Sequence, residues 1–174
     1  MPRRTGNDAS LRDAVKSFWS VRKTQATRQR ASSSADRGGR QASTGGAQMD
    51  GFVELIESKV RNSGVKGIQT YRKGKVALPG YFRPTKQWDL LVLIEGTLVA
   101  AVEVKSQVGS FGNNFNNRVE EAIGSANDIW VAFREGAYDL NPEPWLGYLL
   151  LLEDSPKSTN PVRVVEPHFP VLSD

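Results

Sequence analysis

With 174 residues, 39% of them hydrophobic, and no apolar run long enough to cross a bilayer, the chain is predicted to form one soluble domain, or one domain with an appendage, and no membrane segment. The absence of cysteine excludes disulfides and thiolate metal sites, and the N-terminus lacks the apolar stretch of a secretory signal, so we expect a cytoplasmic protein. The net charge of +4 is uneven, because residues 1–48 carry ten bases against three acids and residues 49–174 carry thirteen bases against sixteen acids.

The basic N-terminal part is predicted to contain a helix and a linker. Residues 1–30 are expected to form a basic helical arm, because apolar residues from Leu11 onward fall on one side of a helix. Residues 31–48 are rich in Ser and Gly, which predicts a flexible loop or linker. A basic arm on a mildly acidic body is typical of a protein that binds a polyanion, most simply nucleic acid, but a solubilising tail would have the same composition.

The core is predicted to occupy residues 49–174 and to open with a helix and two strands. The helix is expected to begin at Asp50, which is a good N-cap. Residues 67–76 then predict a strand, a basic turn at Lys73 and Gly74, and a returning strand.

A long amphipathic helix is predicted in the second half of the core. From Val119 to Phe133, apolar residues recur at helical spacing over about five turns. We expect Trp130 and Phe133 to lie in the core and the polar residues of this segment, including Asp128, to face away from it.

The remaining segments complete the predicted fold. Residues 78–85 are expected to be irregular, and residues 145–153 form a continuous apolar run that predicts a central strand covered on both faces. A loop at residues 155–161 and a short strand at residues 162–165 lead to a C-terminus without a closing element, which hints at truncation. The order of helix, β-meander, long helix and strand predicts an α/β fold with a mixed β-sheet flanked by helices.

Residues 88–105 read as an apolar hairpin that nevertheless carries Asp89, Glu103 and Lys105. Burying an unpaired charge is costly, so such residues are normally paired, metal-bound or functional. Side chains alternate along a strand, which places Glu103 and Lys105 on one face. A three-residue loop at residues 95–97 would pair Asp89 with Glu103 on that same face, whereas a two-residue loop would separate them onto opposite faces. We expect the first register.

Two neighbouring carboxylates repel each other unless a cation lies between them. Oxygen ligands without His or Cys suit Mg²⁺, which can polarise a phosphodiester and activate a water molecule. Lys105 would orient or deprotonate that water and offset negative charge in the transition state. This combination predicts Mg²⁺-dependent phosphodiester hydrolysis, although Glu-x-Lys also occurs on exposed strand edges as a simple salt bridge.

Polar side chains around the start of the long helix are candidates for contacts with double-stranded DNA. Amides can pair with adenine and Arg with guanine, although Asn is also an ordinary turn and cap residue. Lys86 and Arg83 are expected to touch phosphate or solvent. The candidates near the helix are Gln107, Asn113, Asn114, Asn116, Asn117 and Arg118.

The spacing of Asp89, thirteen further residues and then Glu103-x-Lys105 resembles the PD-(D/E)xK nuclease superfamily. Longer blocks are similar to the XhoI-type Type II restriction endonucleases, which cut the palindrome CTCGAG in duplex DNA as homodimers. These blocks are MDGF at residues 49–52, LPGYFRPTKQWDLLV at residues 78–92 and the segment that starts EVKSQVGSFGNN at residues 103–136. The similarity extends from about residue 10 to the C-terminus.

The resemblance implies a restriction-endonuclease-like core with Mg²⁺ on Asp89 and Glu103 and with Lys105 activating the water. It also implies a homodimer in the bacterial cytoplasm, paired with a DNA methyltransferase. Glu54 is a candidate additional acid, but helical angles favour a solvated face for it. Trp88 replaces the proline that often precedes the first acid, and family members continue into further helices. Two alternatives stay open: another PD-(D/E)xK nuclease of repair or junction resolution, and a DNA-binding fragment without cleavage.

Overall fold

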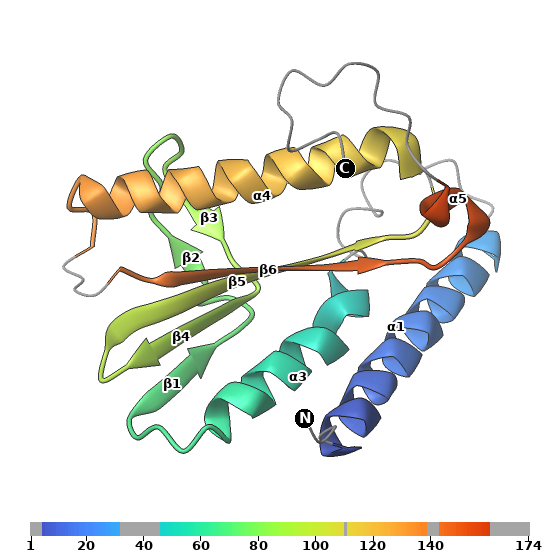
Figure 1. Cartoon of the computed structure of the whole chain (residues 1–174), viewed down its shortest axis with the longest axis horizontal. Coiled ribbons are helices and arrows are strands. Elements are labelled where there is room, and N and C mark those ends of the chain that lie inside the picture. The colour runs from blue at the N-terminus through green and yellow to red at the C-terminus, as the bar shows by residue number, and fades with distance from the viewer. Residues whose placement is uncertain (1–4, 32–45, 110, 139–142, 161–174) are drawn as a thin grey trace.

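The computed structural model describes residues 5–31, 46–109, 111–138 and 143–160. Figure 1 shows helices packed on both sides of a central sheet. In chain order the elements are α1 (Thr5–Ala31), the 3-10 helix η1 (Ala47–Met49), α3 (Asp50–Arg61), β1 (Ile68–Tyr71), β2 (Ala77–Leu78), β3 (Lys86–Gln87), β4 (Leu90–Ile94), β5 (Thr97–Gln107), α4 (Phe111–Arg134), β6 (Trp145–Leu152) and α5 (Pro156–Thr159).

Over the described residues, the main sheet has four strands in the order β1-β4-β5-β6. β1, β4 and β5 are antiparallel, and β6 runs parallel to β5, while β2 and β3 form a separate two-stranded sheet. α1 and α3 lie on one side of the main sheet and α4 lies on the other (Figure 1). The predicted α/β fold with a mixed sheet flanked by helices is confirmed.

Strand alternation divides the core between the two faces of the sheet. On the α1–α3 side, Leu90, Val92, Val102 and Val104 pack with Ala14, Phe18, Phe52 and Val53. On the α4 side, Leu91, Leu98 and Ala101 pack with Val76, Trp88 and Ile129. Leu90 and Val92 on β4, and Val102 and Val104 on β5, follow the two-residue period of the pleat, whereas Leu98 and Ala101 are three residues apart where the pairing is irregular.

The basic helix expected within residues 1–30 forms as α1, and it contributes to the core. Phe18 is fully buried, and its ring lies 6.5 Å from that of Phe52 on α3 at an interplanar angle of 73°. Such an edge-on pair adds to the free energy gained by burying both rings. Residues 32–45, which make up most of the predicted linker, lie outside the described residues.

Two strand predictions are wrong in their pairing. The turn at Lys73 and Gly74 forms, with φ of 57° and 85°, but the strand after it pairs with β3 instead of returning along β1. β1 pairs with β4. The segment after the turn is also joined to the segment after β3 by the hydrogen bond from Trp88 N–H to Val76 O. Among the described residues β6 lies at the edge of the sheet, not in its centre.

The two C-terminal helices also differ from expectation. α4 begins at Phe111, well before Val119, so the Asn-rich segment is helical. α5 occupies part of the predicted loop, because Ser155 caps it through a reciprocal capping box with Ser158. The strand predicted at residues 162–165 lies outside the described residues. None of the described helices is long and apolar enough to span a membrane.

The buried face of α4 is rotated from the predicted one. Trp130 is 37% exposed and Ile123 is 64% exposed, whereas Asp128 is buried with 3% exposure. The expectation that Asp128 faces away from the core and that Trp130 lies within it is therefore wrong. The physical reason is that Asp128 binds the loop between β2 and β3, where it accepts hydrogen bonds from Phe82 N–H and Arg83.

Candidate active site

The hairpin between β4 and β5 sets the relative position of the two acids. Its turn has two residues, Glu95 and Gly96, both with positive φ, so the expected three-residue loop is wrong. Such a turn alone would place Asp89 and Glu103 on opposite faces. A β-bulge then shifts the register by one residue. Leu93 pairs with Leu98, but the next residue of β4, Val92, pairs with Ala100. Leu90 then pairs with Val102, so that Asp89, which directly precedes β4, lies next to Val102 and Val104, the two neighbours of Glu103 on β5.

Asp89 lies directly before β4 and is held by the backbone of β5. Its N–H donates to Val102 O at 3.0 Å, and its Oδ2 accepts from Val104 N–H at 2.7 Å. Burial raises the pKa of Asp89 above its usual value, and the charge of Glu103 adds to this effect. The Val104 hydrogen bond and the nearby lysines act in the opposite direction without cancelling it.

Glu103 lies between two ammonium groups. Its Oε2 accepts from Lys86 Nζ at 2.6 Å, and its Oε1 forms an ion pair with Lys105 Nζ. Both Glu103 and Lys86 are buried, with side-chain exposures of 7% and 11%. Lys86 Nζ also lies 4.6 Å from the centroid of the Trp88 ring, which favours a cation at that position.

Lys105 is a cation in this arrangement. Burial lowers the pKa of a lysine, but the hydrogen bond to Glu103 and the charges of Glu103, Asp89 and Glu121 outweigh it and raise the pKa of Lys105. At neutral pH the side chain therefore carries its proton. It can donate a hydrogen bond to an oxygen atom and offset negative charge, and it is poorly suited to take up a proton.

Two pockets meet at Glu103 and Lys105. One of about 380 Å³ is also bordered by Asp89, Asp50, Lys73 and Trp88. The other, of about 550 Å³, is bordered by Arg83, Lys86, Asn117 and Glu121 in addition to the shared pair. Glu103 and Lys105 thus form the wall between a pocket that contains both acids of the hairpin and a pocket that contains further cations.

The carboxylates on the first pocket fit a hard divalent cation. The repulsion from Glu103 that helps to raise the pKa of Asp89 is what a bound cation would relieve. Mg²⁺ commonly takes only one or two protein carboxylates and completes its shell with water and phosphate oxygens. Within the described parts of the chain, no three His, Cys, Asp or Glu side chains cluster as metal ligands.

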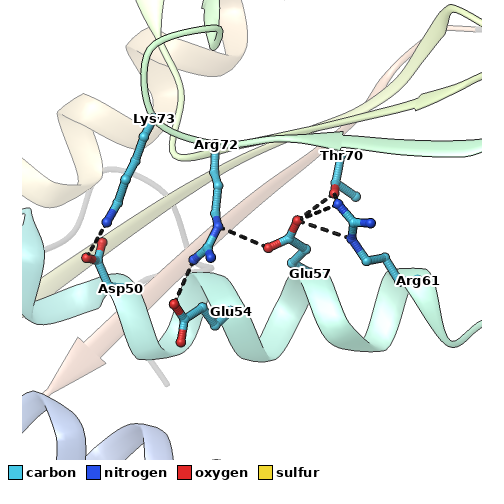
Figure 2. A network of polar contacts seen from close by, with 7 residues as sticks. All are labelled: Asp50, Glu54, Glu57, Arg61, Thr70, Arg72 and Lys73. Carbon is cyan, nitrogen blue, oxygen red and sulfur yellow. Dashed lines mark hydrogen bonds and ion pairs between the residues drawn. The ribbon is translucent and has the colours of Figure 1, made fainter.

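The wall of this pocket is tied down by a network of charges on α3 (Figure 2). Lys73 Nζ pairs with Asp50 at 2.7 Å, and Arg72 bridges Glu54 and Glu57 at 2.9 and 3.1 Å. The hydroxyl of Thr70 donates to Glu57 and is the largest cause of its lowered pKa, which Arg61 and Arg72 lower further against the effect of burial. The network fixes the turn after β1 relative to α3.

The additional-acid candidate Glu54 points away from the site. Its side chain is 59% exposed and is paired with Arg72, and it borders neither of the two pockets described above. Asp50, one helical turn earlier, borders the pocket of Asp89. The sequence predicted Asp50 as the N-cap, which is wrong: Met49 occupies that position, and Asp50 is the first residue of α3, where its negative charge is favourable near the helix N-terminus.

The predicted DNA-contacting residues have different surroundings. Asn116 and Asn117 are exposed, and Asn117 borders the second pocket. Arg118 pairs with Glu121 across one turn of α4. Gln107 is buried with 3% exposure and donates to Phe111 O, and its Oε1 has no partner among the described residues. The side chains of Asn113 and Asn114 lie outside the described residues.

Sequence reasoning missed two contacts that shape the site. Lys86 was expected to contact phosphate or solvent, whereas in the structure its Nζ donates a hydrogen bond to Glu103. Asp128 was expected in solvent, and it binds the loop that carries Arg83, which borders the second pocket. Both contacts join residues far apart in the sequence, so no local pattern signals them.

The chain is similar throughout to known restriction enzymes. The family model described as Restriction endonuclease XhoI matches residues 28–174. The Type II restriction enzyme BstVI of Geobacillus stearothermophilus is 54% identical over 148 residues, which cover 82% of this chain and 66% of that enzyme. AbrI of Azospirillum brasilense is 48% identical over 164 residues, 93% of this chain and 73% of that enzyme. XhoI of Xanthomonas vasicola is 47% identical over 170 residues, which cover 96% of this chain and 68% of that enzyme.

The chain spans about two thirds of the length of these relatives. No solved structure matches it significantly. The similarity covers both strands of the hairpin and all of α4, and therefore the whole of the candidate site.

Proposed function

The chain belongs to the XhoI restriction endonuclease family, and from this premise we propose that it cleaves duplex DNA at a specific sequence by Mg²⁺-dependent phosphodiester hydrolysis. The observation that carries the proposal is that Asp89, Glu103 and Lys105 border one pocket. By resemblance, the target is a CTCGAG-like palindrome and the enzyme acts as a homodimer in the bacterial cytoplasm, where a DNA methyltransferase protects the host sequence.

In the proposed site, Asp89 and Glu103 would hold the metal ion. When bound, Mg²⁺ would polarise the phosphodiester and lower the pKa of a water molecule. Lys105 orients the attacking water and offsets the charge that develops on the phosphate, consistent with its raised pKa and its ammonium form. The hydrogen bond from Val104 N–H keeps the Asp89 carboxylate in a fixed orientation.

Contacts with DNA are proposed on the side of the second pocket. Asn116 and Asn117 are exposed on α4, and Asn117 borders the pocket that contains Glu103 and Lys105. We propose that these amides, together with Arg118, contact bases in a groove. Gln107, Asn113 and Asn114 complete the proposed set. Lys86 would contact phosphate once it leaves Glu103, and a symmetric partner would supply the second half of a palindromic site.

Plasmid digestion tests this function. Purified protein is incubated with Mg²⁺ and plasmids that carry or lack CTCGAG, and the ends of any fragments are mapped. Discrete fragments from the first plasmid only are expected. Nicking that depends on DNA structure would support the repair or junction nuclease, and binding without cuts would support a DNA-binding module without cleavage. Glu103→Gln should retain DNA binding and lose cleavage.

A further inference from the structure

The loop between β2 and β3 presents two neighbouring aromatic side chains to solvent. Tyr81 is 54% exposed and Phe82 is 65% exposed. Their rings lie 5.0 Å apart at an interplanar angle of 82°. Single exposed hydrophobic residues are common on protein surfaces, whereas two adjacent aromatic rings that are both largely exposed point to a binding surface.

The loop is held rigidly despite its irregular backbone. Asp128 on α4, which is 3% exposed, accepts hydrogen bonds from Phe82 N–H at 2.8 Å and from Arg83 Nε at 2.6 Å. A Cβ at Gly80 would lie 2.8 Å from Asp128 Cγ, so only glycine allows this approach. Figure 1 shows the loop rising beside α4. The two rings are therefore displayed in a fixed position, which lowers the entropic cost of binding.

The charge around the loop indicates the chemistry of the partner. Residues 62–88 contain six Lys and Arg and no Asp or Glu. Two of these cations, Arg83 and Lys86, border the pocket that also contains Glu103 and Lys105. A basic segment interleaved with aromatic residues suits nucleic acid, where cations meet phosphates and rings meet bases. The same segment on a second copy of this chain would bring like charges together.

We propose that Tyr81 and Phe82 pack against DNA bases beside the phosphate that is cut. Asp128 and Gly80 act as positioning residues that hold the two rings at this place. Aromatic rings bind bases through stacking or by wedging between base steps, and neither contact neutralises a phosphate. This inference rests on the proposed function and assigns to the β2–β3 loop a part of DNA binding that the amides of α4 do not supply.

Binding of a duplex oligonucleotide by the full chain tests the inference. The variants Tyr81→Ala and Phe82→Ala are compared with the wild type on a duplex that contains CTCGAG, with Ca²⁺ in place of Mg²⁺ to slow hydrolysis. Each should weaken binding by roughly five- to 100-fold. The slope of log affinity against log salt concentration should not change, because no phosphate contact is lost. Trp145→Ala is the matched control, since Trp145 is 64% exposed and lies outside the loop.

Gly80→Ala tests the positioning role without removing any ring or charge. It should weaken binding to a similar extent and leave the far-ultraviolet circular dichroism of the free protein unchanged. The inference is overturned if the loop variants bind as the wild type does, if Trp145→Ala weakens binding equally, if the salt slope falls, or if the loop variants instead dissociate a homodimer. A wild type that neither binds nor cuts the duplex would remove the proposed function itself.

Discussion

The contact between Lys86 and Glu103 gives the sharpest quantitative prediction. Removing one member of a buried ion pair costs about 3–5 kcal/mol, because the other charge stays buried without compensation. In Lys86→Met, Glu103 keeps Lys105 as a partner, so we expect the free energy of unfolding to fall by about 2 kcal/mol. In Glu103→Gln the loss should be about 3 kcal/mol, since Lys86 is only 11% exposed while Lys105, at 31%, can turn toward solvent.

The double variant separates a true coupling from two independent losses. Lys86→Met with Glu103→Gln leaves no uncompensated charge at this position, so its cost should be about 2–3 kcal/mol instead of the sum of about 5 kcal/mol. Urea unfolding of the metal-free proteins at pH 7, followed by tryptophan fluorescence, measures all four free energies. Additivity within about 0.5 kcal/mol would refute the contact. Lys73→Met is the control, because its ion pair with Asp50 is exposed and should contribute at most about 1 kcal/mol.

Three further predictions concern charge. Asp89→Asn should raise the melting temperature of the metal-free protein at pH 7, because the raised pKa of Asp89 means that folding disfavours its ionised form. This gain in melting temperature should vanish below pH 3.8, where the carboxyl is protonated in both the folded and the unfolded state. A gain that persists below pH 3.8 would contradict this cause. Glu57→Gln should cost about 1–2 kcal/mol at pH 7 by urea unfolding, and because the pKa of Glu57 is lowered, this difference should shrink as the pH falls below 4.5; a constant difference would be contrary to this. Replacing Arg12, Lys16 and Lys23 on α1 with Gln should reduce the slope of log affinity for DNA against log salt concentration by up to about three, since each lost phosphate contact reduces it by about one. An unchanged slope would exclude contact between these α1 side chains and DNA.

The helix α1 illustrates what a charge pattern can and cannot predict. Its basic residues and its helical period are evident in the sequence, and both suggested an arm. The sequence pattern did not reveal that Phe18 packs against Phe52. The apolar stripe around Phe18 is short, and Phe52 lies 34 residues later in the chain. Deletion of residues 1–30 would therefore remove part of the core together with the charge, which is why charge-only substitutions test DNA contact more cleanly.

The hairpin shows how a prediction can be right about which residues come together and wrong about how. The apolar alternation and the spacing predicted that Asp89 and Glu103 lie close together, and both border one pocket. The predicted loop length was wrong, because Glu95 and Gly96 form a two-residue turn. No residue type at the bulge signals in the sequence that the register shifts there. A bulge depends on how the strands pack, here on keeping Leu90 in one cluster and Leu91 in the other.

Asp128 was misplaced for a related reason. Helical periodicity assigns an acid among apolar neighbours to the solvent face, since burying a lone carboxylate is costly. The cost is offset here by Phe82 N–H and Arg83, which reach Asp128 from a loop 45 residues away and lower its pKa against the effect of burial. α4 consequently turns its Asp128 side inward and exposes Ile123. Polar contacts of this kind override periodicity, and they concentrate where a loop must be held in a fixed position.

The charges of the site also explain why it should be less stable than its surroundings. Burial and the charge of Glu103 disfavour the ionised form of Asp89 and raise its pKa, and Glu103 depends on two lysines for compensation. A divalent cation held by Asp89 and Glu103 would relieve the first cost and compete with the lysines for the second. Lys86 and Lys105 would then be free to meet an anion on the adjacent pocket, where both already form part of the wall. Uptake of the cation and capture of a phosphate would thus favour each other, because each removes the charge that the other leaves uncompensated.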